Sequence, residues 1–266
     1  SNSRFHIFIK FCLFSIETPI FDAMIFTNLI QTNLRTKVFG NKIEYYQRLG
    51  STNEEAWDLI DSGEARHGMI VITDNQFSGK GRDKNQWYMS PSKSLAMSII
   101  IMEPLEIEKS FLIPLSGSVA VAKALKNRGF IPQLKWPNDI LLNGKKCGGI
   151  LCESRVLNKE VNQMVIGIGL NVNDQKEDLN SEIQEKATSL FIEKGHPNQR
   201  ELIAAIIITY FEQLFNDLSV VTNQWSDYCV HLNEEISFKH QNSIQKGIFK
   251  GIKSNGLASV QIADEI

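Results

Sequence analysis

The motif Lys135-Trp136-Pro137-Asn138-Asp139 lies near the middle of the chain, downstream of a loop rich in glycine and cations. Pro137 fixes its own φ and lacks a backbone N–H, and it drives the preceding Trp136 toward extended geometry. We therefore expect a strand that ends at Lys135 and a turn that carries Asn138 and Asp139. A cation, an amide and a carboxylate that converge on one strand corner suit the handling of an anion together with a nucleotide or a metal.

A second cationic motif, GKGR at residues 79–82, lies within a long connection over residues 75–93. A connection of this length without its own periodicity is either disordered or a functional lid, and Trp87 argues against a purely disordered segment. Each motif alone has an ordinary explanation, as a flexible basic loop or as turn composition after proline. Because more of the same pattern surrounds them, we interpret the two together as a site for chemistry at a phosphate or an activated carboxylate.

The chain has 266 residues, of which 42% are hydrophobic and 22% are charged, and its formal net charge is -2. This length predicts one larger domain and one small domain, and the composition is ordinary for a globular protein. The net charge gives no overall attraction to nucleic acid or to anionic membranes, so anion binding must come from local cations. The four cysteines lack metal-ligand spacing, which predicts free thiols in a reducing, cytoplasmic compartment.

Residues 1–40 are expected to form an N-terminal extension. Its apolar part, residues 5–16, is interrupted by Lys10, is too short to span a bilayer and lacks a signal-peptide cleavage pattern. Met24 is a candidate for the natural start, a hypothesis that mass spectrometry of the native protein would test. The extension is too short for a winged helix-turn-helix, so we expect a helix or arm packed on the body, no nucleic-acid partner and no membrane.

Hydrophobic patterning predicts an α+β domain over residues 41–230, in which helices pack on one face of a mixed sheet. Thr52 and Glu55 predict a capping box at the start of the first helix. From residue 231 onward short strands predict a small β module of SH3-like size that stops early. The expected strands are 42–49, 68–73 and 94–102, the expected hairpins are 140–153 and 156–172 with turns at 143–144 and 158–159, and the expected helices begin at 52 and cover 107–128, 199–218 and 222–229.

A dinucleotide-binding fold is excluded by its missing fingerprint. Gly167-x-Gly169-x-Asn171 ends a strand, but it opens no helix and lacks the third glycine of that motif.

Several motifs in one order resemble those of the biotin protein ligases, over roughly residues 43–262. These motifs are Ser51-Thr52-Asn53, Gln76 with the GKGR run, the Lys135–Asp139 motif, Lys146-x-Gly148-Gly149-Ile150-Leu151, Gly167-x-Gly169-x-Asn171-x-Asn173 and Thr188-Ser189-Leu190. The resemblance implies the class II synthetase-like catalytic domain that these enzymes share with lipoate ligases and octanoyl transferases, followed by an SH3-like domain. This sequence departs from the family pattern in two places. Lys80 replaces the usual arginine, which is expected to loosen the grip on carboxylate or phosphate. The C-terminal module lacks its last strand.

The same resemblance implies a reaction in two steps. Biotin and ATP, with Mg²⁺, give biotinyl-5′-adenylate, and a lysine of a biotin carboxyl carrier protein of the acetyl-CoA carboxylase type then attacks this mixed anhydride. Lys135 and Arg82 are implied as the catalytic cations that reduce repulsion between the carboxylate and the α-phosphate. The loop over residues 76–91 is expected to be mobile without ligand and to become ordered over the adenylate, excluding water.

The implied site residues divide into two sets, and metal ligands stay unassigned. Helix capping is an alternative role for Ser51 and Thr52, and turn formation is one for Asn138. Biotin binding is implied for Ser51, Thr52, Asn53, Gln76, Gly79, Lys80, Gly81, Arg82, Lys135, Gly148 and Gly149. ATP binding is implied for Lys80, Arg82, Lys135, Asn138 and Asn171.

Three alternative functions make different demands on the sequence. A lipoate or octanoate ligase or transferase of the same fold would need a nucleophilic Cys or Lys or a long aliphatic tunnel, and the Lys135–Asp139 motif favours biotin. A biotin-responsive repressor would need a basic helix-turn-helix, which the first 40 residues do not supply. A binding protein without activity would be expected to lose Lys135 or Arg82. Formation of a homodimer is left open.

Overall fold

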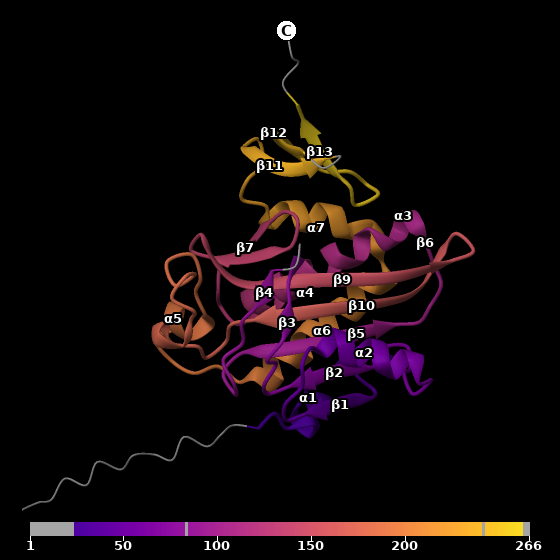
Figure 1. Cartoon of the computed structure of the whole chain (residues 1–266), viewed down its shortest axis with the longest axis vertical. Coiled ribbons are helices and arrows are strands. Elements are labelled where there is room, and N and C mark those ends of the chain that lie inside the picture. Colours follow the sequence, from indigo (N-terminus) through magenta and orange to yellow (C-terminus); the bar gives the residue numbers. More distant parts are fainter. Residues whose placement is uncertain (1–23, 83–84, 241–242, 263–266) are drawn as a thin grey trace, which may run out of the picture.

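A mixed eight-stranded sheet forms the centre of the structure, a computed structural model that describes residues 24–82, 85–240 and 243–262 (Figure 1). The strands follow the order β1-β2-β5-β10-β9-β8-β7, and β6 pairs with β10. β1 and β2 pair in parallel, and the neighbouring pairs from β2 to β7 are antiparallel. The bounds are β1 Ile43–Tyr46, β2 Ile70–Thr73, β5 Leu95–Ile101, β6 Leu105–Glu106, β7 Pro132–Lys135, β8 Asp139–Leu142, β9 Lys145–Leu157 and β10 Glu160–Leu170.

Both predicted hairpins are present. β8 and β9 turn at Asn143-Gly144, where both residues have positive φ, as Asn and Gly tolerate better than other residues. β9 and β10 turn at residues 158–159, also with positive φ. Lys135 is the last residue of β7 and pairs with Asp139 at the start of β8, so the predicted strand end and corner are confirmed.

Three helices cover one face of the sheet, and a fourth packs on the other. On the first face, α4 packs against both α6 and α7. α2 packs against Val71, Ile100 and Val165, which lie on the opposite face. The α+β class is confirmed, and α2 adds a second covered face. The helix expected over 107–128 is interrupted at Phe111. The bounds are α1 Thr27–Asn33, α2 Thr52–Asp61, α3 Ile107–Ser110, α4 Leu112–Asn127, α5 Leu190–Lys194, α6 Arg200–Asn216 and α7 Val221–Tyr228.

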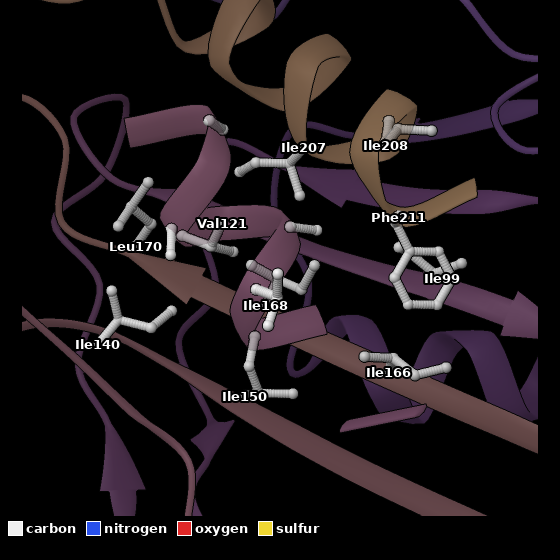
Figure 2. Packing of buried hydrophobic residues seen from close by; sticks show 14 of the residues in the cluster. Ile99, Val121, Ile140, Ile150, Ile166, Ile168, Leu170, Ile207, Ile208 and Phe211 are labelled. Atoms are coloured by element: carbon white, nitrogen blue, oxygen red, sulfur yellow. The ribbon is translucent and has the colours of Figure 1, made fainter. Parts of the chain in front are cut away.

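The main core lies between α4, α6 and the sheet. Figure 2 shows Ile150 and Ile168, from neighbouring strands, facing Val121 of α4, while Phe211 of α6 packs beside Ile99. All five side chains are buried. Because side chains alternate along a strand, the residues between these isoleucines face the opposite side of the sheet. In β9 and β10 several of those residues are glycines, which leaves open space on that side.

The predicted capping box at Thr52 and Glu55 is wrong. The residue before the helix is Ser51, whose side chain makes no capping hydrogen bond. The backbone N–H of Thr52 donates instead to Oε1 of Gln76 at 2.8 Å. A side chain from the next loop thus satisfies a donor that local capping would otherwise satisfy.

Residues 24–40 pack on the body as a short helix and arm, as expected. α1 contacts α6, and Ile30 is fully buried in the main core. The Glu212 carboxylate accepts the backbone N–H groups of residues 37–39 at 2.6–2.8 Å. This part of the predicted extension therefore belongs to the body, and the apolar run expected within residues 1–23 lies outside the described residues.

The C-terminal strands form a separate antiparallel sheet beyond α7, at the top of Figure 1. Its strands are β11 Glu235–His240, β12 Ser243–Ile252 and β13 Ala258–Gln261. Phe249 of β12 is fully buried and joins the main core, with Trp136 and Trp225 each 6.2 Å away between ring centroids. The predicted small β module is confirmed, and one aromatic side chain fixes it to the body.

The cysteines that the structure describes, Cys147, Cys152 and Cys229, are free thiols, as predicted. Within the described ranges no single helix is long and apolar enough to cross a membrane. The bent pair Arg200–Asn216 and Leu218–Tyr228 has the length and the composition of a membrane span, and it meets those two criteria only.

Candidate functional site

Two adjoining cavities open on the face of the sheet opposite α4. The first, of about 310 Å³, lies among the start of α2, the GKGR loop and the middle of β9 and β10. The second, of about 880 Å³, lies among residues 86–91, the ends of β7 to β9 and the segment after β10. Gln86, Trp87, Asp139 and Lys146 line both cavities, so the two spaces meet at these side chains.

Glycines form the floor of the first cavity. A Cβ at Gly167 would lie 2.4 Å from Oδ1 of Asn53, and one at Gly169 would lie 2.5 Å from the Trp87 ring. Any other residue at either position would have to displace the side chain of Asn53 or Trp87. Glycine therefore lets the side chains of Asn53 and Trp87 pack directly on the backbone of β10 at the edge of the cavity.

A polar network closes one end of the first cavity, which Ser51, Thr52, Asn53 and Gln76 all line, as the sequence predicts. Gln76 Oε1 accepts from the backbone N–H and the hydroxyl of Thr52. The hydroxyl of Ser98 lies 2.8 Å from Thr52 Oγ1 and 2.6 Å from Asn53 Oδ1. Sequence reasoning missed Ser98, whose signal is a small polar residue within an otherwise apolar strand.

The GKGR loop forms a short antiparallel pair, β3 (Gly79–Lys80) and β4 (Gln86–Trp87), beside the first cavity. Lys80 Nζ lies 2.5 Å from Oε1 of Glu54, and this hydrogen bond raises the pKa of Lys80, with partial burial opposing the shift. Lys80 is thus held as a cation, although it is compact where an arginine would offer a planar fork. Lys80, Gly81 and Arg82 line the first cavity, and the buried Gly79 does not.

The structure places the two predicted catalytic cations in different cavities. Arg82 lines the first cavity, whereas Lys135 lines the second together with Asn171. Asn138, predicted to face a nucleotide, lines the first cavity, and its Nδ2 donates to the backbone carbonyl of Ile150 at 2.9 Å. Of the two predicted glycines of β9, Gly149 lines the first cavity and Gly148 lines neither.

Lys146 stands at the junction and was not predicted as a site residue. Its Nζ lies 2.5 Å from Oδ1 of Asp139 and 5.9 Å from the centroid of the Trp87 ring. Trp87 Nε1 is buried and has no hydrogen-bond partner among the described residues. The available signal was that Lys146 opens the motif Lys146-x-Gly148-Gly149-Ile150-Leu151, which is part of the family resemblance. The junction therefore offers a cation held in place, flanked by a carboxylate and an indole.

A buried carboxyl group lies in the second cavity. Asp174 is buried there, and its Oδ2 has no hydrogen-bond partner within the described ranges. Burial raises the pKa of Asp174, although the Ser90 and Ser94 hydroxyls oppose that shift. No group of three His, Cys, Asp or Glu side chains gathers as a metal site in the part of the chain that the structure describes. One free carboxylate oxygen fits Mg²⁺, which proteins often hold through one or two carboxylates plus phosphate oxygens.

The chain is similar in sequence to known proteins. Residues 45–171 match the biotin/lipoate A/B protein ligase family. Over 243 residues the chain is 30% identical to the bifunctional ligase/repressor BirA of Bacillus subtilis, covering 89% of this chain and 74% of that protein. It is 29% identical over 223 residues to the biotin--[acetyl-CoA-carboxylase] ligase of Paracoccus denitrificans, covering 79% and 90%.

Solved structures show the same fold. The biotin protein ligase of Aquifex aeolicus in complex with biotin and ATP aligns with a TM-score of 0.68 at 21% identity, covering 83% of this chain and 91% of that one. The biotin protein ligase of Leishmania major in complex with biotinyl-5-AMP aligns with a TM-score of 0.59 at 20% identity, covering 85% and 97%.

Proposed function

The chain belongs to the biotin/lipoate A/B protein ligase family, and we propose that it acts within that family as an ATP-dependent biotin protein ligase. The observation that carries this proposal is the pair of adjoining cavities, one with glycines in its lining and closed by amides and hydroxyls, the other lined by both lysines and carboxylates. Their meeting point holds a fixed lysine, as a reaction between two anionic substrates requires.

Biotin occupies the first cavity. Its ureido ring is a flat group with both donors and acceptors, which matches the Thr52 and Gln76 pair and the free space over Gly149 of β9. Its carboxylate points toward Lys146, the cation that lines both cavities, and toward Arg82, which lines the first. Ser98 holds Thr52 and Asn53 in place from below, so that the ring meets a preorganised set of partners.

ATP occupies the second cavity. Lys135 and Lys146 supply positive charge to its phosphates, and Asn171 lines the wall, where its Nδ2 donates to the backbone carbonyl of Thr188 at 3.0 Å. Asp174 is the residue that would hold Mg²⁺ beside the phosphates. When bound, Mg²⁺ neutralises charge on the phosphate oxygens and makes pyrophosphate a better leaving group.

In the first step a carboxylate oxygen of biotin attacks the α-phosphorus of ATP. The new oxygen–phosphorus bond forms as the bond to the bridging oxygen breaks, and pyrophosphate leaves. The repulsion between the two anions is offset by Lys146 at the junction, with Arg82 on the biotin side and Lys135 on the phosphate side. A cation fixed before the reaction needs no reorganisation when the negative charge concentrates.

In the second step the neutral amine of a carrier lysine attacks the acyl carbon of the adenylate. The nitrogen–carbon bond forms, AMP leaves, and the amine loses its proton to solvent. The acceptor is a biotin carboxyl carrier protein, consistent with relatives named for acetyl-CoA carboxylase. We propose a cytoplasmic enzyme that binds neither nucleic acid nor membranes, supported by the free thiols and the net charge of -2; a homodimer remains compatible with these features.

The proposal is tested by mass spectrometry of a carrier domain incubated with the protein, ATP-Mg²⁺ and biotin. The expected result is a carrier heavier by one biotinyl group, with no change when ATP or biotin is omitted. Parallel reactions with lipoate or octanoate distinguish the other activities of this fold. A carrier that gains an octanoyl or lipoyl group, and no biotinyl group, would overturn the assignment.

A further inference from the structure

His231 lies where the C-terminal module meets the corner after Lys135. Its side chain is 3% exposed. The backbone N–H of Trp136 donates to Nε2 of His231 at 3.3 Å. The imidazole stacks on Phe249 of β12, with 4.3 Å between ring centroids, and meets the edge of Trp225 at 6.2 Å. One side chain thus contacts the corner, α7 and the C-terminal sheet at the same time.

The backbone around His231 reinforces this arrangement. Residues 229–231 connect α7 to the C-terminal module, and Cys229 forms a parallel bridge with Leu134 of β7. The N–H of Val230 donates to the carbonyl of Leu134 at 3.3 Å. The end of β7 is therefore held on both sides of Lys135. The connection after α7 binds the backbone of Leu134, and the imidazole of His231 binds the backbone of Trp136.

We propose that His231, in its neutral form, is a positioning residue that fixes the Lys135–Trp136 corner for adenylate formation and links it to the C-terminal module. The proposal rests on the proposed function, because Lys135 matters for catalysis only if the protein forms an adenylate. His231 itself contacts no substrate. Its effect is exerted through the direction in which Lys135 leaves the strand.

The protonation state of His231 decides whether this contact exists. Nε2 accepts a hydrogen bond only when it carries no proton, so the proton of the neutral ring lies on Nδ1, 3.6 Å from Sγ of Cys229. Burial and the nearby charge of Lys135 both lower the pKa of His231, and Glu234 opposes them. Protonation would turn an acceptor into a donor that faces an N–H, and would add a positive charge beside Lys135.

The test compares His231→Phe with a matched control, His67→Phe. Phenylalanine keeps the ring contacts of His231 and removes the acceptor. Nδ1 of His67 likewise accepts a backbone N–H, from Met102 at 3.2 Å, within an aromatic cluster of Phe39 and Phe215 that lines neither cavity. Both variants lose the same kind of hydrogen bond, and only one loses it at the corner. Thermal unfolding of each variant shows that it folds.

The readout is biotin-dependent pyrophosphate release from about pH 5 to about pH 8, the range in which histidine titrates. His231→Phe is expected to lower kcat about three- to tenfold, as for the loss of one neutral hydrogen bond, with little change in biotin affinity, and to flatten the acid side of the kcat profile. His231→Gln, which retains an acceptor, recovers kcat in part. Equal kcat in His231→Phe and His67→Phe, or an unchanged acid limb, overturns the proposal. Absence of biotin-dependent pyrophosphate release from the unmodified protein instead overturns the proposed function.

Discussion

The ion pair with Asp139, rather than burial, fixes the position of the Lys146 side chain. Both side chains are partly exposed, so their ion pair contributes little to stability, typically below about 1 kcal/mol. The ion pair instead orients the Lys146 side chain, because it holds the ammonium group between the two cavities. The indole of Trp87 lies on the other side, close enough for a weak cation–π contact.

Lys146→Ala is therefore expected to lower the rate of adenylate formation about 10²–10³-fold, the usual cost of removing one preorganised charge from such a transition state. Lys135→Ala should act in the same direction. Lys109→Ala is the matched control, because Lys109 is also ion-paired but lies outside both cavities. Single-turnover pyrophosphate release measures all three, and a Lys146→Ala rate within twofold of the control would remove Lys146 from the mechanism.

Gly148 and Gly149 are neighbours with different reasons for lacking a side chain. A Cβ at Gly148 would lie 2.9 Å from the carbonyl oxygen of Gly169, whereas one at Gly149 would meet nothing closer than 3.5 Å, at Cε of Lys146. Gly149→Ala should thus fold normally and weaken biotin binding about tenfold or more, because its methyl group enters the space of the ligand. Gly148→Ala should lower the free energy of unfolding by about 1–3 kcal/mol. Calorimetric titration and denaturant melts separate the two, and equal biotin affinity in Gly149→Ala and the unmodified protein would show that no ligand approaches this strand.

At the scale of elements, the pair β3–β4 places Lys80 at the first cavity and Trp87 at the junction. It is a two-residue ladder, and Lys80 is tied to α2 through Glu54. So short a pair has little stability of its own. Ligand charge between the loop and the floor would add the partner that Arg82 needs to keep the loop closed.

Residues 76–91 are accordingly expected to gain protection from hydrogen exchange when biotin and ATP are both present, since ordering of the loop and binding strengthen each other. The β9–β10 turn at residues 158–159 serves as an internal control, because it lies outside both cavities. Protection that rises equally in the loop and the turn, or in neither, would contradict the lid.

Local chemistry explains which elements could be predicted from sequence. Asn143-Gly144 predicts its hairpin because the turn itself needs positive φ, and Pro137 predicts the strand end at Lys135. The start of α2 was misread because the partner of Thr52 is Gln76, from a loop 24 residues away. The separation of Arg82 from Lys135 into two cavities depends on strand register and on where Trp87 lies, which no local pattern encodes.

At the scale of the whole molecule, two buried or half-buried histidines stay neutral in the fold. Burial lowers the pKa of His67, and burial together with Lys135 lowers that of His231, from an ordinary value of 6.5. The unfolded chain therefore binds more protons than the folded one below that pH. The contribution of these groups is full above 6.5 and is lost as the pH falls through 6.5 toward the folded pKa values.

The urea midpoint is thus expected to fall between about pH 7.5 and about pH 5.5, the window set by these histidines. The double variant carrying His67→Phe and His231→Phe should show a weaker pH dependence over the same interval. A midpoint that is constant in the unmodified protein, or an equal slope in the double variant, would contradict the assignment of this effect to the two rings.

The overall architecture followed from the sequence more readily than the site did. The α+β class, the three helices on one face and the C-terminal β module came from periodicity and turns. The role of Phe249 as the anchor of that module, and of residues 24–40 as part of the body, depends on long-range packing that composition does not reveal. Ser98 joins the site through the pairing of β5 with β10, strands distant in sequence, and Lys146 does so through its contact with the distant Trp87.

The most direct test of the central claim, that two adjoining cavities unite biotin with ATP, is the exchange of labelled pyrophosphate into ATP without any carrier protein. The account predicts exchange that requires biotin, is lost in Lys146→Ala and persists in Lys109→Ala. Exchange that proceeds without biotin, or that lipoate or octanoate supports as well as biotin does, would contradict it.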